Sequence, residues 1–552
     1  MGRNVSGSSF LDQVGGISLI ASSAISAGDL VSNNETGYAT RSLAHFSMTP
    51  TQENNTVGGN NALKTVAPLV GATGSGVGNQ STMKGPFIAE LGNGNIVHVY
   101  TGNGTTANTN LNAVIRSVNG NDIVSAAVIG VISTDTAIYC AVRKLNATQF
   151  VIAWNSNSTL KFAVLNNDGT IAVSATTVAT LYGSGSAIYW AFNVTTSGQI
   201  VLAYSLVTSS DMVFKRYNAA GVLQGSETVV ESGANSGSGI NVLSCANGDF
   251  VISYKRSAAT AAYKFARYNA SGTIQGALTT ILTASSDITY GAVIQSAIEL
   301  AGGNIVFQTS NNTSAAYRQI SIYNASNALV KTFDIGNDAG YGLSTSGYSE
   351  YLGMCANRNG SFAIASVNGG SVGIIVLSPD GFVIKPATNL DLGMTLLGNN
   401  PVSGILLFSL DNAGYAVVRG AYNNTGTQRE IYQTCITPDL ALLGSAVALF
   451  PAASAAATDV SAILTSANIL VTSFYYPGNG IRAAYYQVCK RSITGVALNS
   501  VSAGGTVCLA TKGTMPINQQ NVIGAIFDNR AQAVIGVKAT IVGSNIVMNG
   551  VV

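Results

Sequence analysis

The sequence has little charge for its length. Its 552 residues include 26 Lys and Arg and 24 Asp and Glu, so 9% are charged, against about 25% in an ordinary soluble domain. The net charge of +2 gives no electrostatic footprint for nucleic acid or for an anionic membrane. No run of about 18 apolar residues exists, which excludes a hydrophobic membrane-spanning helix. Hydrophobic residues still make up 47%, so the chain can bury a large core.

Residue types that carry catalysis or metal binding are also scarce. The chain has two histidines, His45 and His98, and no acidic residue adjoins His45. No GxSxG, HExxH, P-loop or EF-hand pattern occurs. The cysteines form no CxxC pair and no Cys/His cluster. We therefore predict no catalytic residue, no metal and no cofactor. We expect buried free thiols at Cys140, Cys245, Cys355, Cys435, Cys489 and Cys508.

The N-terminal sequence lacks the form of a secretory signal. Arg3 is followed by a polar stretch that includes Asp12, and the apolar run at 17–25 is interrupted by serines. A signal peptide needs a continuous apolar core after its basic start. We expect no signal peptide and synthesis in a reducing cytoplasm.

A repeated segment dominates what the sequence does contain. Each copy has a polar turn with Gly or Asn, then a short run of β-forming residues that often ends in an aromatic residue. The first apolar residues of these runs lie 50 to 57 residues apart. Eight units at so regular a period predict a repeat architecture. These first residues are Ile96, Phe150, Ile200, Phe250, Ile305, Phe362, Tyr415 and Ile469.

Each unit predicts four antiparallel strands. One β-run precedes the signature, as at 137–142, and another follows the last turn, as at 277–282. Between them, a third run ends in a turn rich in Asn, Asp and Gly, which suits a tight hairpin. The clearest copies are FAVLNNDGTI at 162–171, FKRYNAAGVL at 214–223, FARYNASGTI at 265–274, ISIYNASNAL at 320–329 and IIVLSPDGFV at 374–383.

The signature strand is apolar on both of its faces. Phe150, Ile152 and Trp154 point one way, and Val151 and Ala153 point the other. A sheet with one wet face would alternate apolar and polar residues, so this strand lies between two other sheets. Four-stranded sheets stacked in a closed series are the blades of a propeller. The sequence therefore predicts an all-β fold, an eight-bladed β-propeller of four-stranded antiparallel blades.

The predicted ring closes through the N-terminal part of the chain. The eighth unit has three strands and ends near 483–489, before the chain changes character. ALKTVA at 62–67 is close to the fourth-strand run ALTTIL at 277–282. We predict that 62–70 supplies the outer strand of the last blade, since opening such a clasp would expose a strand edge. The predicted propeller then covers 61–490.

The terminal segments 1–60 and 491–552 do not fit the repeat, but they resemble each other. ISAGDLV at 25–31 and VSAGGTV at 501–507 share one pattern, and each follows a short apolar run and precedes a turn with Gly. If the clasp forms, both segments leave the ring at the same blade. We expect them to form one small β-domain or to dock on a partner.

The SAG-x-x-V strand and turn, beside a Gly/Asn/Ser/Thr-rich β-domain with few charges, resembles bacteriophage virion proteins of the tail-fibre, receptor-binding and head-decoration types. The motif covers the terminal segments, and composition alone covers the remainder. The resemblance implies a repeated structural protein of a virus particle. The termini would be the anchor to other virion proteins, and the propeller would be the display head. No site residue is carried over from it.

Two sets of repeated side chains are candidates for surface or glycan contacts. The aromatic set could stack on sugars, but we favour packing between blades near the strand ends. The arginine set could contact glycans or form a solvated face. We expect His98, which occupies a position that is aliphatic or aromatic in other units, to be a hydrogen-bonded core residue. The two sets are Tyr100, Trp154, Tyr204 and Tyr254, and Arg116, Arg216, Arg267 and Arg318.

Three classes of function remain open on the sequence. The first is a non-enzymatic phage virion protein that is located on the particle, is multicopy or homo-oligomeric, and contacts a host glycan or protein receptor. The second is a bacterial lectin-like adhesin, against which the missing signal peptide counts. The third is a polysaccharide-acting propeller enzyme, although the Ser-x-Asp-x-Gly-x-Thr-Trp box of sialidase-like propellers is absent. We favour the first, with no nucleic acid partner and no membrane insertion.

Overall fold

The structure is a computed structural model, and all of its described elements are β-strands. No helix in these described parts has the length and apolarity to cross a membrane. The chain divides into two compact units, one over Gly58–Ser409 and Ala413–Tyr486 and the other over Met1–Val57, Leu410–Asn412 and Gln487–Val552. The structure describes 16–20, 30–33, 39–41, 64–67, 87–101, 111–117, 122–124, 137–156, 158–181, 189–206, 208–234, 239–256, 261–284, 297–311, 317–343, 352–368, 371–392, 405–410, 414–422, 429–442, 447–449, 458–466, 469–476, 480–487, 493–497, 506–510, 513–516, 538–542 and 545–550.

The larger unit holds eight four-stranded antiparallel sheets, numbered here as blades 1 to 8 along the ring. Blades 1 and 2 are β5 (Phe87–Glu90), β6 (Ile96–Thr101), β7 (Leu111–Arg116), β8 (Asp122–Val124), and β9 (Ala137–Lys144), β10 (Gln149–Ser156), β11 (Thr159–Asn166), β12 (Ile171–Thr180). Blades 3 and 4 are β13 (Trp190–Val194), β14 (Ile200–Ser205), β15 (Met212–Tyr217), β16 (Thr228–Glu231), and β17 (Asn241–Ser244), β18 (Phe250–Arg256), β19 (Ala261–Tyr268), β20 (Thr279–Ala284).

The second half of the ring repeats this plan. Blades 5 and 6 are β21 (Ala297–Glu299), β22 (Ile305–Asn311), β23 (Tyr317–Tyr323), β24 (Leu329–Asp334), and β25 (Gly353–Ala356), β26 (Phe362–Asn368), β27 (Ser371–Leu377), β28 (Val383–Asp391). Blades 7 and 8 are β29 (Ile405–Ser409), β30 (Tyr415–Tyr422), β31 (Arg429–Ile436), β32 (Val447–Ala448), and β33 (Thr458–Leu464), β34 (Ile469–Tyr476), β35 (Gly480–Gln487), β4 (Lys64–Ala67).

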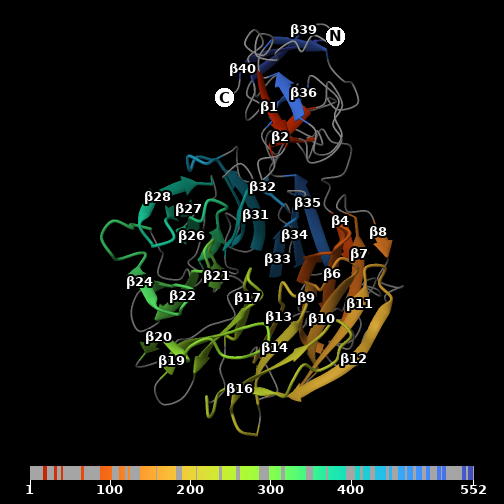
Figure 1. The fold of residues 1–552 in the computed structure, drawn as a ribbon, viewed down its shortest axis with the longest axis vertical. Coiled ribbons are helices and arrows are strands. Elements are labelled where there is room, and N and C mark those ends of the chain that lie inside the picture. Colours follow the sequence, from red (N-terminus) through yellow and green to blue (C-terminus); the bar gives the residue numbers. More distant parts are fainter. Residues whose placement is uncertain are drawn as a thin grey trace, which may run out of the picture. The chain divides into compact units, whose positions relative to one another are not determined.

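The blades form a closed ring (Figure 1). The first strand of each blade contacts the first strand of the next one, from β5 and β9 through to β29 and β33. The contact between β33 and β5 then joins blade 8 to blade 1. The predicted eight-bladed propeller is therefore confirmed, and the repeated signature is the second strand of every blade.

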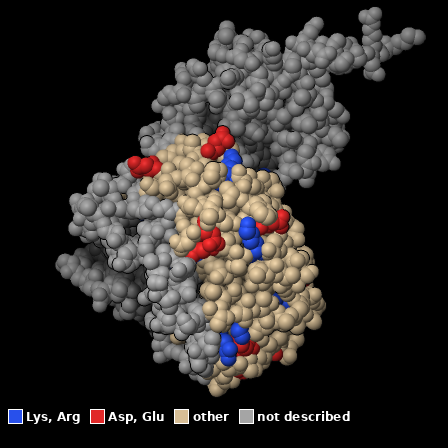
Figure 2. All heavy atoms as spheres, turned by 90° about the vertical axis from the view of Figure 1, so that its left-hand side faces the viewer, with Lys and Arg blue, Asp and Glu red and all other residues tan. Residues whose placement is uncertain are grey.

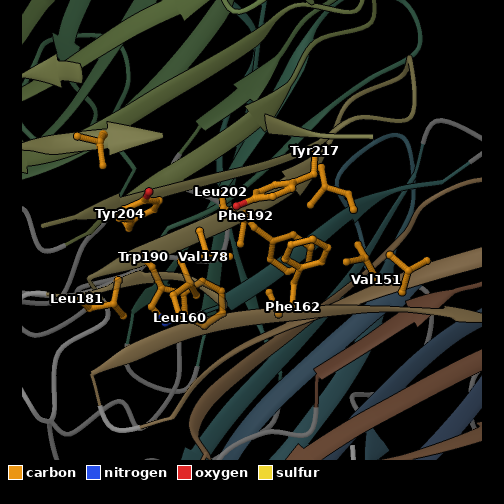
Figure 3. Packing of buried hydrophobic residues seen from close by; sticks show 14 of the residues in the cluster. Val151, Leu160, Phe162, Val178, Leu181, Trp190, Phe192, Leu202, Tyr204 and Tyr217 are labelled. Carbon is orange, nitrogen blue, oxygen red and sulfur yellow. The ribbon is translucent and has the colours of Figure 1, made fainter. Parts of the chain in front are cut away.

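The burial of the second strand on both faces is also confirmed. In β10, Phe150, Ile152 and Trp154 pack with residues of blade 1. Val151 and Ala153 of the same strand pack with residues of blade 3, as Figure 3 shows for Val151. The strand β14 divides its side chains between blades 2 and 4 in the same way. Alternating side chains of one strand thus serve two interfaces, which is why both parities are apolar.

The hairpin turn between the third and fourth strands explains a second part of the repeat. Its last residue has a positive φ, which glycine adopts without strain, as in Gly221 and Gly272 (φ 72° and 77°). In blade 5, Asn327 fills the same position with φ 63°. The turn begins with a residue such as Asn218, whose Oδ1 accepts the backbone N–H of Ala220 and of Val222. The Asn-x-x-Gly pattern thus encodes this turn.

The clasp is formed by β4, whose residues Lys64 to Ala67 pair antiparallel with β35. Ile481 lies opposite Ala67, and Ala483 lies opposite Lys64. Blade 8 is the blade that contains Ile469, as expected for the segment 62–70. A strand from the N-terminal part of the chain therefore completes the last sheet.

The smaller unit is a β-domain built from both ends of the chain. Its five-stranded sheet has the order β1 (Gly16–Ile20), β37 (Thr506–Ala510), β36 (Ile493–Ala497), β2 (Leu30–Asn33) and β3 (Ala39–Arg41). A second sheet has the order β38 (Gly513–Pro516), β40 (Asn545–Gly550) and β39 (Lys538–Val542).

The two terminal segments that share the Ser-Ala-Gly motif, at 25–31 and 501–507, exchange strands within the five-stranded sheet. When the copies are aligned on Ser26 and Ser502, β1 corresponds to β36 and β2 corresponds to β37 without a gap. Strand β1 pairs with β37, and β2 pairs with β36. Each first strand therefore pairs with the second strand of the other copy.

Candidate functional surface

The four repeated aromatic residues lie in the interior of the ring. Each lies four residues after the first apolar residue of its signature strand, and all four are buried. They are Tyr100 in β6, Trp154 in β10, Tyr204 in β14 and Tyr254 in β18. Each packs with side chains of the preceding blade. This corrects their interpretation as surface contacts for glycans. They fill the interfaces between blades, which is the interpretation that the sequence favoured.

The hydroxyl groups of two of these tyrosines bind partly buried carboxylates. Tyr254 donates a hydrogen bond to Glu231 Oε2 at 2.6 Å, and Lys264 Nζ lies 2.5 Å from Glu231 Oε1. Burial opposes the ionisation of Glu231, but hydrogen bonds from Lys264 and Tyr254 and the charges of Lys264 and Arg256 lower its pKa overall. Burial and the Glu231 carboxylate raise the pKa of Tyr254.

This Tyr254–Glu231–Lys264 cluster joins the outer strand of blade 3 to blade 4. Tyr204 makes a similar hydrogen bond to Glu227 at 2.5 Å. Since burial and the carboxylate keep the Tyr204 hydroxyl protonated by raising its pKa, neither tyrosine is suited to act as a nucleophile at neutral pH. The clusters connect strands and present no accessible acid–base pair.

The four arginines do not form one equivalent set, which corrects the sequence interpretation. Arg216 and Arg267 share a ladder position, opposite Val201 and Val251. Arg116 instead lies opposite Ile96, and Arg318 lies opposite Ser310. Arg116, Arg267 and Arg318 are buried, and Arg216 is half-buried. Buried guanidinium groups do not form a glycan-binding face.

Arg216 and Arg267 hold the turns of the following blade. Arg216 Nη1 donates to the carbonyl of Ala270 at 2.7 Å, and Arg267 Nη2 donates to that of Gly303 at 2.9 Å. Lys331 makes the same kind of contact with Gly381 O at 3.1 Å. Several of the few charged residues thus connect neighbouring blades.

His98 lies across the junction of blades 8 and 1. Its Nε2 is 2.7 Å from Tyr485 Oη, and its Nδ1 is 3.3 Å from Ser473 Oγ. Burial, helped by the charge of Arg116, lowers its pKa to about 3, so the imidazole is neutral. This is the hydrogen-bonded core histidine expected from the sequence, whereas His45 lies outside the described residues.

The described cysteines are free and buried at Cys140, Cys245, Cys355 and Cys435. Burial raises the pKa of Cys245 to about 12, which keeps its thiol protonated and unreactive. Cys489 and the side chain of Cys508 lie outside the described part of the chain. Within the described residues, no group of three His, Cys, Asp or Glu side chains could hold a metal ion.

One repeated feature does face solvent. In blades 2 to 6, the second residue after the positive-φ residue of the last hairpin turn is an aliphatic residue that is 38% to 53% exposed. It begins the fourth strand in blades 2, 5 and 6 and forms an isolated bridge ahead of that strand in blades 3 and 4. Each lies opposite the third-strand residue that also pairs with the first apolar residue of the signature strand. We call these five residues the rim band. They are Ile171, Leu223, Ile274, Leu329 and Val383.

The rim band belongs to a chain in which only 9% of the residues are charged. Lys, Arg, Asp and Glu are few and scattered over the described surface in Figure 2. Isolated exposed apolar residues are ordinary, but the rim band repeats at one ladder position in five consecutive blades. The repetition can be recognised in the sequence, because each rim-band residue is the last residue of one of the five segments given above, from 162–171 to 374–383.

Comparisons with known proteins add no family to these observations. No family model matches the chain, and no curated protein matches it. Puromycin hydrolase is similar at 11% identity and a TM-score of 0.40, over 76% of this chain and 61% of that one. The chain thus covers less than two thirds of the hydrolase.

Two further solved structures are similar over more of their own length. The β-propeller domain of the Trilobed protease from Pyrococcus furiosus has 9% identity and a TM-score of 0.36, over 66% of this chain and 98% of that one. The polysaccharide lyase Uly1 has 11% identity and a TM-score of 0.38, over 77% and 100%. At these values the similarities carry no inference about activity.

Proposed function

We propose that this protein is a non-enzymatic structural protein of a bacteriophage particle, of the tail-fibre or surface-display kind. The segments 1–60 and 491–552 attach it to other virion proteins, and the ring contacts the host surface. The protein is made in the host cytoplasm and acts in several copies. Weak contacts made by many linked copies add up to strong attachment without any new contact.

The observation that carries this proposal is the rim band. Five aliphatic side chains at one ladder position form a contact surface that does not depend on catalytic groups. Apolar side chains favour a protein partner, because they offer no hydrogen-bonding groups to a sugar. We therefore propose a protein receptor in preference to a glycan.

The strand exchange between β1, β2, β36 and β37 supports an attachment role for the termini. Both ends of the chain are tied into one sheet, so this unit gives the ring a single attachment point. The resemblance of SAGDLV and SAGGTV to each other fits a small β-unit that exists in two copies.

The rim band is tested by binding of the full chain to the bacterial cells on which the particle grows. The variant L223S/I274S/L329S removes three rim-band side chains that are 42% to 53% exposed, and I123S/V229S/I384S removes three aliphatic side chains outside the band that are 50% to 54% exposed. We expect the first variant to bind at least about tenfold more weakly and the control to bind like the parent. Equal binding of both variants would remove the support for a rim contact.

A further inference from the structure

The first strands of the blades enclose a space that solvent reaches on the inside of the ring. Each contacts the first strand of the next blade, and Figure 1 shows them around the middle of the ring. The second strands are buried, as in β14, whereas first strands such as β13 and β17 carry half-exposed side chains. Each first strand pairs on its outer edge with a buried second strand, so the solvent that it reaches lies inside the ring. We call this space the central channel.

Arg143 is the only charged residue at its ladder position in blades 1 to 7. It lies on the first strand β9, opposite Val151, the residue that follows the first apolar residue of the signature strand. Most of the residues at the equivalent position in the other six of these blades are apolar, so the cation stands among uncharged neighbours along the channel wall. These residues are Ala89, Asn193, Leu243, Ile298, Cys355 and Phe408.

The guanidinium of Arg143 is enclosed by protein without being cut off from water. The side chain is exposed, yet desolvation by the surrounding protein lowers its pKa. A side chain on a convex surface would be exposed without being desolvated. The two observations together place the group in a concave space that water enters, which on a first strand is the central channel. Arginine stays protonated in proteins, so this position carries a positive charge.

The contacts of Arg143 hold its guanidinium in place and leave most of it available. Its Nη1 donates to the carbonyl of Val142 at 2.8 Å. Its Cζ lies 5.8 Å from the ring centre of Phe192, on the first strand of the next blade. Contact with an aromatic face orients the planar group. Within the described part of the chain, Arg143 has no carboxylate partner and no further acceptor, so its other N–H groups can bind a ligand.

The charges around Arg143 favour a ligand with a single negative charge. Glu90 and Glu299 lie at the adjacent ladder position of blades 1 and 5, opposite Ile96 and Ile305. Their carboxylates already accept backbone N–H groups of the preceding blades, and they oppose the approach of a doubly charged anion. A carboxylate carries one charge, and its two oxygens match the guanidinium with two parallel hydrogen bonds.

The wall of the channel favours a ligand with an apolar body. Leu243, Ile298 and Phe408 share the ladder position of Arg143 and are half-exposed, although they lie on first strands. Sites for small molecules combine such apolar walls with a few polar groups that fix the orientation of the ligand. A carboxylate bound at Arg143 would extend an apolar body along this wall.

We infer that the central channel binds a small organic monocarboxylate, with its carboxylate on the guanidinium of Arg143 and its apolar body against the channel wall. The site lies on first strands, whereas the rim band lies beyond the third strands. The inference therefore does not depend on the proposed receptor contact or on attachment through the termini.

The test uses benzoate as the probe, with the full chain in a chloride-free buffer and binding measured by ligand-observed NMR. We expect saturable binding of one benzoate per chain. Benzamide has the same shape without the charge, and inorganic phosphate has charge without the apolar body. Each should bind at least about tenfold more weakly than benzoate.

Variants at two adjacent residues separate the guanidinium from net charge. Arg143→Met keeps an apolar stem and should weaken benzoate binding at least about tenfold. Arg143→Lys keeps the charge but loses the planar fork, so it should also bind more weakly than the parent. Lys144→Met removes the same charge from the next residue, which points to the other face of β9, and should change binding less than about threefold. Thermal unfolding verifies that each variant folds.

A covalent readout locates the site. Under illumination, 4-azidobenzoate should label peptides that contain β9 or β13, and an excess of benzoate should prevent this labelling. Absence of saturable benzoate binding up to about 10 mM would overturn the inference. So would benzamide or phosphate binding as tightly as benzoate, an Arg143→Met variant that binds like the parent, equal losses in Arg143→Met and Lys144→Met, or labelling confined to other strands.

Discussion

The junction of blades 2 and 3 and the junction of blades 8 and 1 fill the same kind of space with different chemistry. Blades 2 and 3 follow each other in the chain and meet through an apolar cluster (Figure 3). In this cluster the ring centroids of Phe162 and Tyr217 lie 4.7 Å apart. Blades 8 and 1 come from distant segments. Their cluster is joined by His98, Tyr485 and Ser473 and by the clasp strand β4.

The aromatic contact is a repeated device, because equivalent pairs join blades 3 and 4 and blades 4 and 5. These pairs involve Tyr268 and Tyr323, which like Tyr217 precede equivalent turns. Where the chain itself connects two blades, this apolar packing is accompanied by polar contacts such as those of Arg216 with Ala270 and of Tyr254 with Glu231. Between blades 8 and 1, the hydrogen bonds of His98 are fully buried, and the strand β4, which precedes blade 1 in the chain, completes the sheet of blade 8.

The largest effect should come from removing the clasp. Deletion of residues 1–75 removes β4 and exposes the edge of β35, so the ring should lose its cooperative thermal transition. Deletion of residues 1–50 keeps β4 and should leave the transition of the ring in place. Equal stability of the two truncated chains would mean that the ring closes without β4.

The apolar junctions can be broken with one charge. Phe250 is fully buried, and its ring lies 5.3 Å from that of Phe214 in the preceding blade. Phe250→Asp places an unpaired carboxylate there and should reduce the unfolding free energy by about 4 to 5 kcal/mol or more. Phe250→Leu is the control and should cost about 1 to 2 kcal/mol. Chemical denaturation measures both, and an unchanged midpoint for the aspartate variant would refute the burial of this strand on both faces.

The polar junction should respond to acid. The folded-state pKa of His98 is about 3, against an ordinary value of 6.5. Below about pH 6.5, His98 therefore binds a proton in the unfolded chain but not in the folded chain. The free energy of unfolding falls as the pH drops from there towards 3. The expected loss from His98 is about 2 kcal/mol at pH 5. The variant His98→Leu should lack this part of the pH dependence, and an identical acid profile for parent and variant would contradict the assignment.

A smaller effect is expected from removing a glutamate contact at either of two junctions between blades. Glu90 accepts hydrogen bonds from the backbone N and Oγ of Ser466, across blades 1 and 8. Glu299 accepts the backbone N of Ala246, across blades 5 and 4. Substitution to Gln should cost about 1 kcal/mol at Glu90 and less at Glu299, where the chain already connects the two blades. A larger loss for Glu299→Gln in thermal unfolding would reverse this comparison.

The architecture was readable from the sequence because each blade repeats one local code. The Asn-x-x-Gly turn, the signature strand with two apolar faces and the match between 62–67 and 277–282 are all patterns of short range. They predicted eight blades and the strand that completes blade 8. The strand exchange of the termini was not readable, because residue types do not specify which copy a strand pairs with.

The candidate site was less readable for a physical reason. The sequence favoured packing between blades for Tyr204 and Tyr254, but it did not show that their hydroxyl groups bind Glu227 and Glu231, each 23 residues further along the chain. The partners of a buried polar group are set by tertiary contacts, which composition does not show. The repeated aliphatic residues of the rim band could be identified in the sequence, but their exposure to solvent depends on which strand is outermost in each blade.

The most direct test of the proposed role is cross-linking mass spectrometry of purified particles. The proposal predicts that the chain is a component of the particle and that its cross-links to other virion proteins fall within 1–60 and 491–552. Reactive side chains beside the rim band, such as Lys331 next to Leu329, should be free of such cross-links. Absence of the chain from the particle, or cross-links to virion proteins concentrated on the blades, would contradict the account.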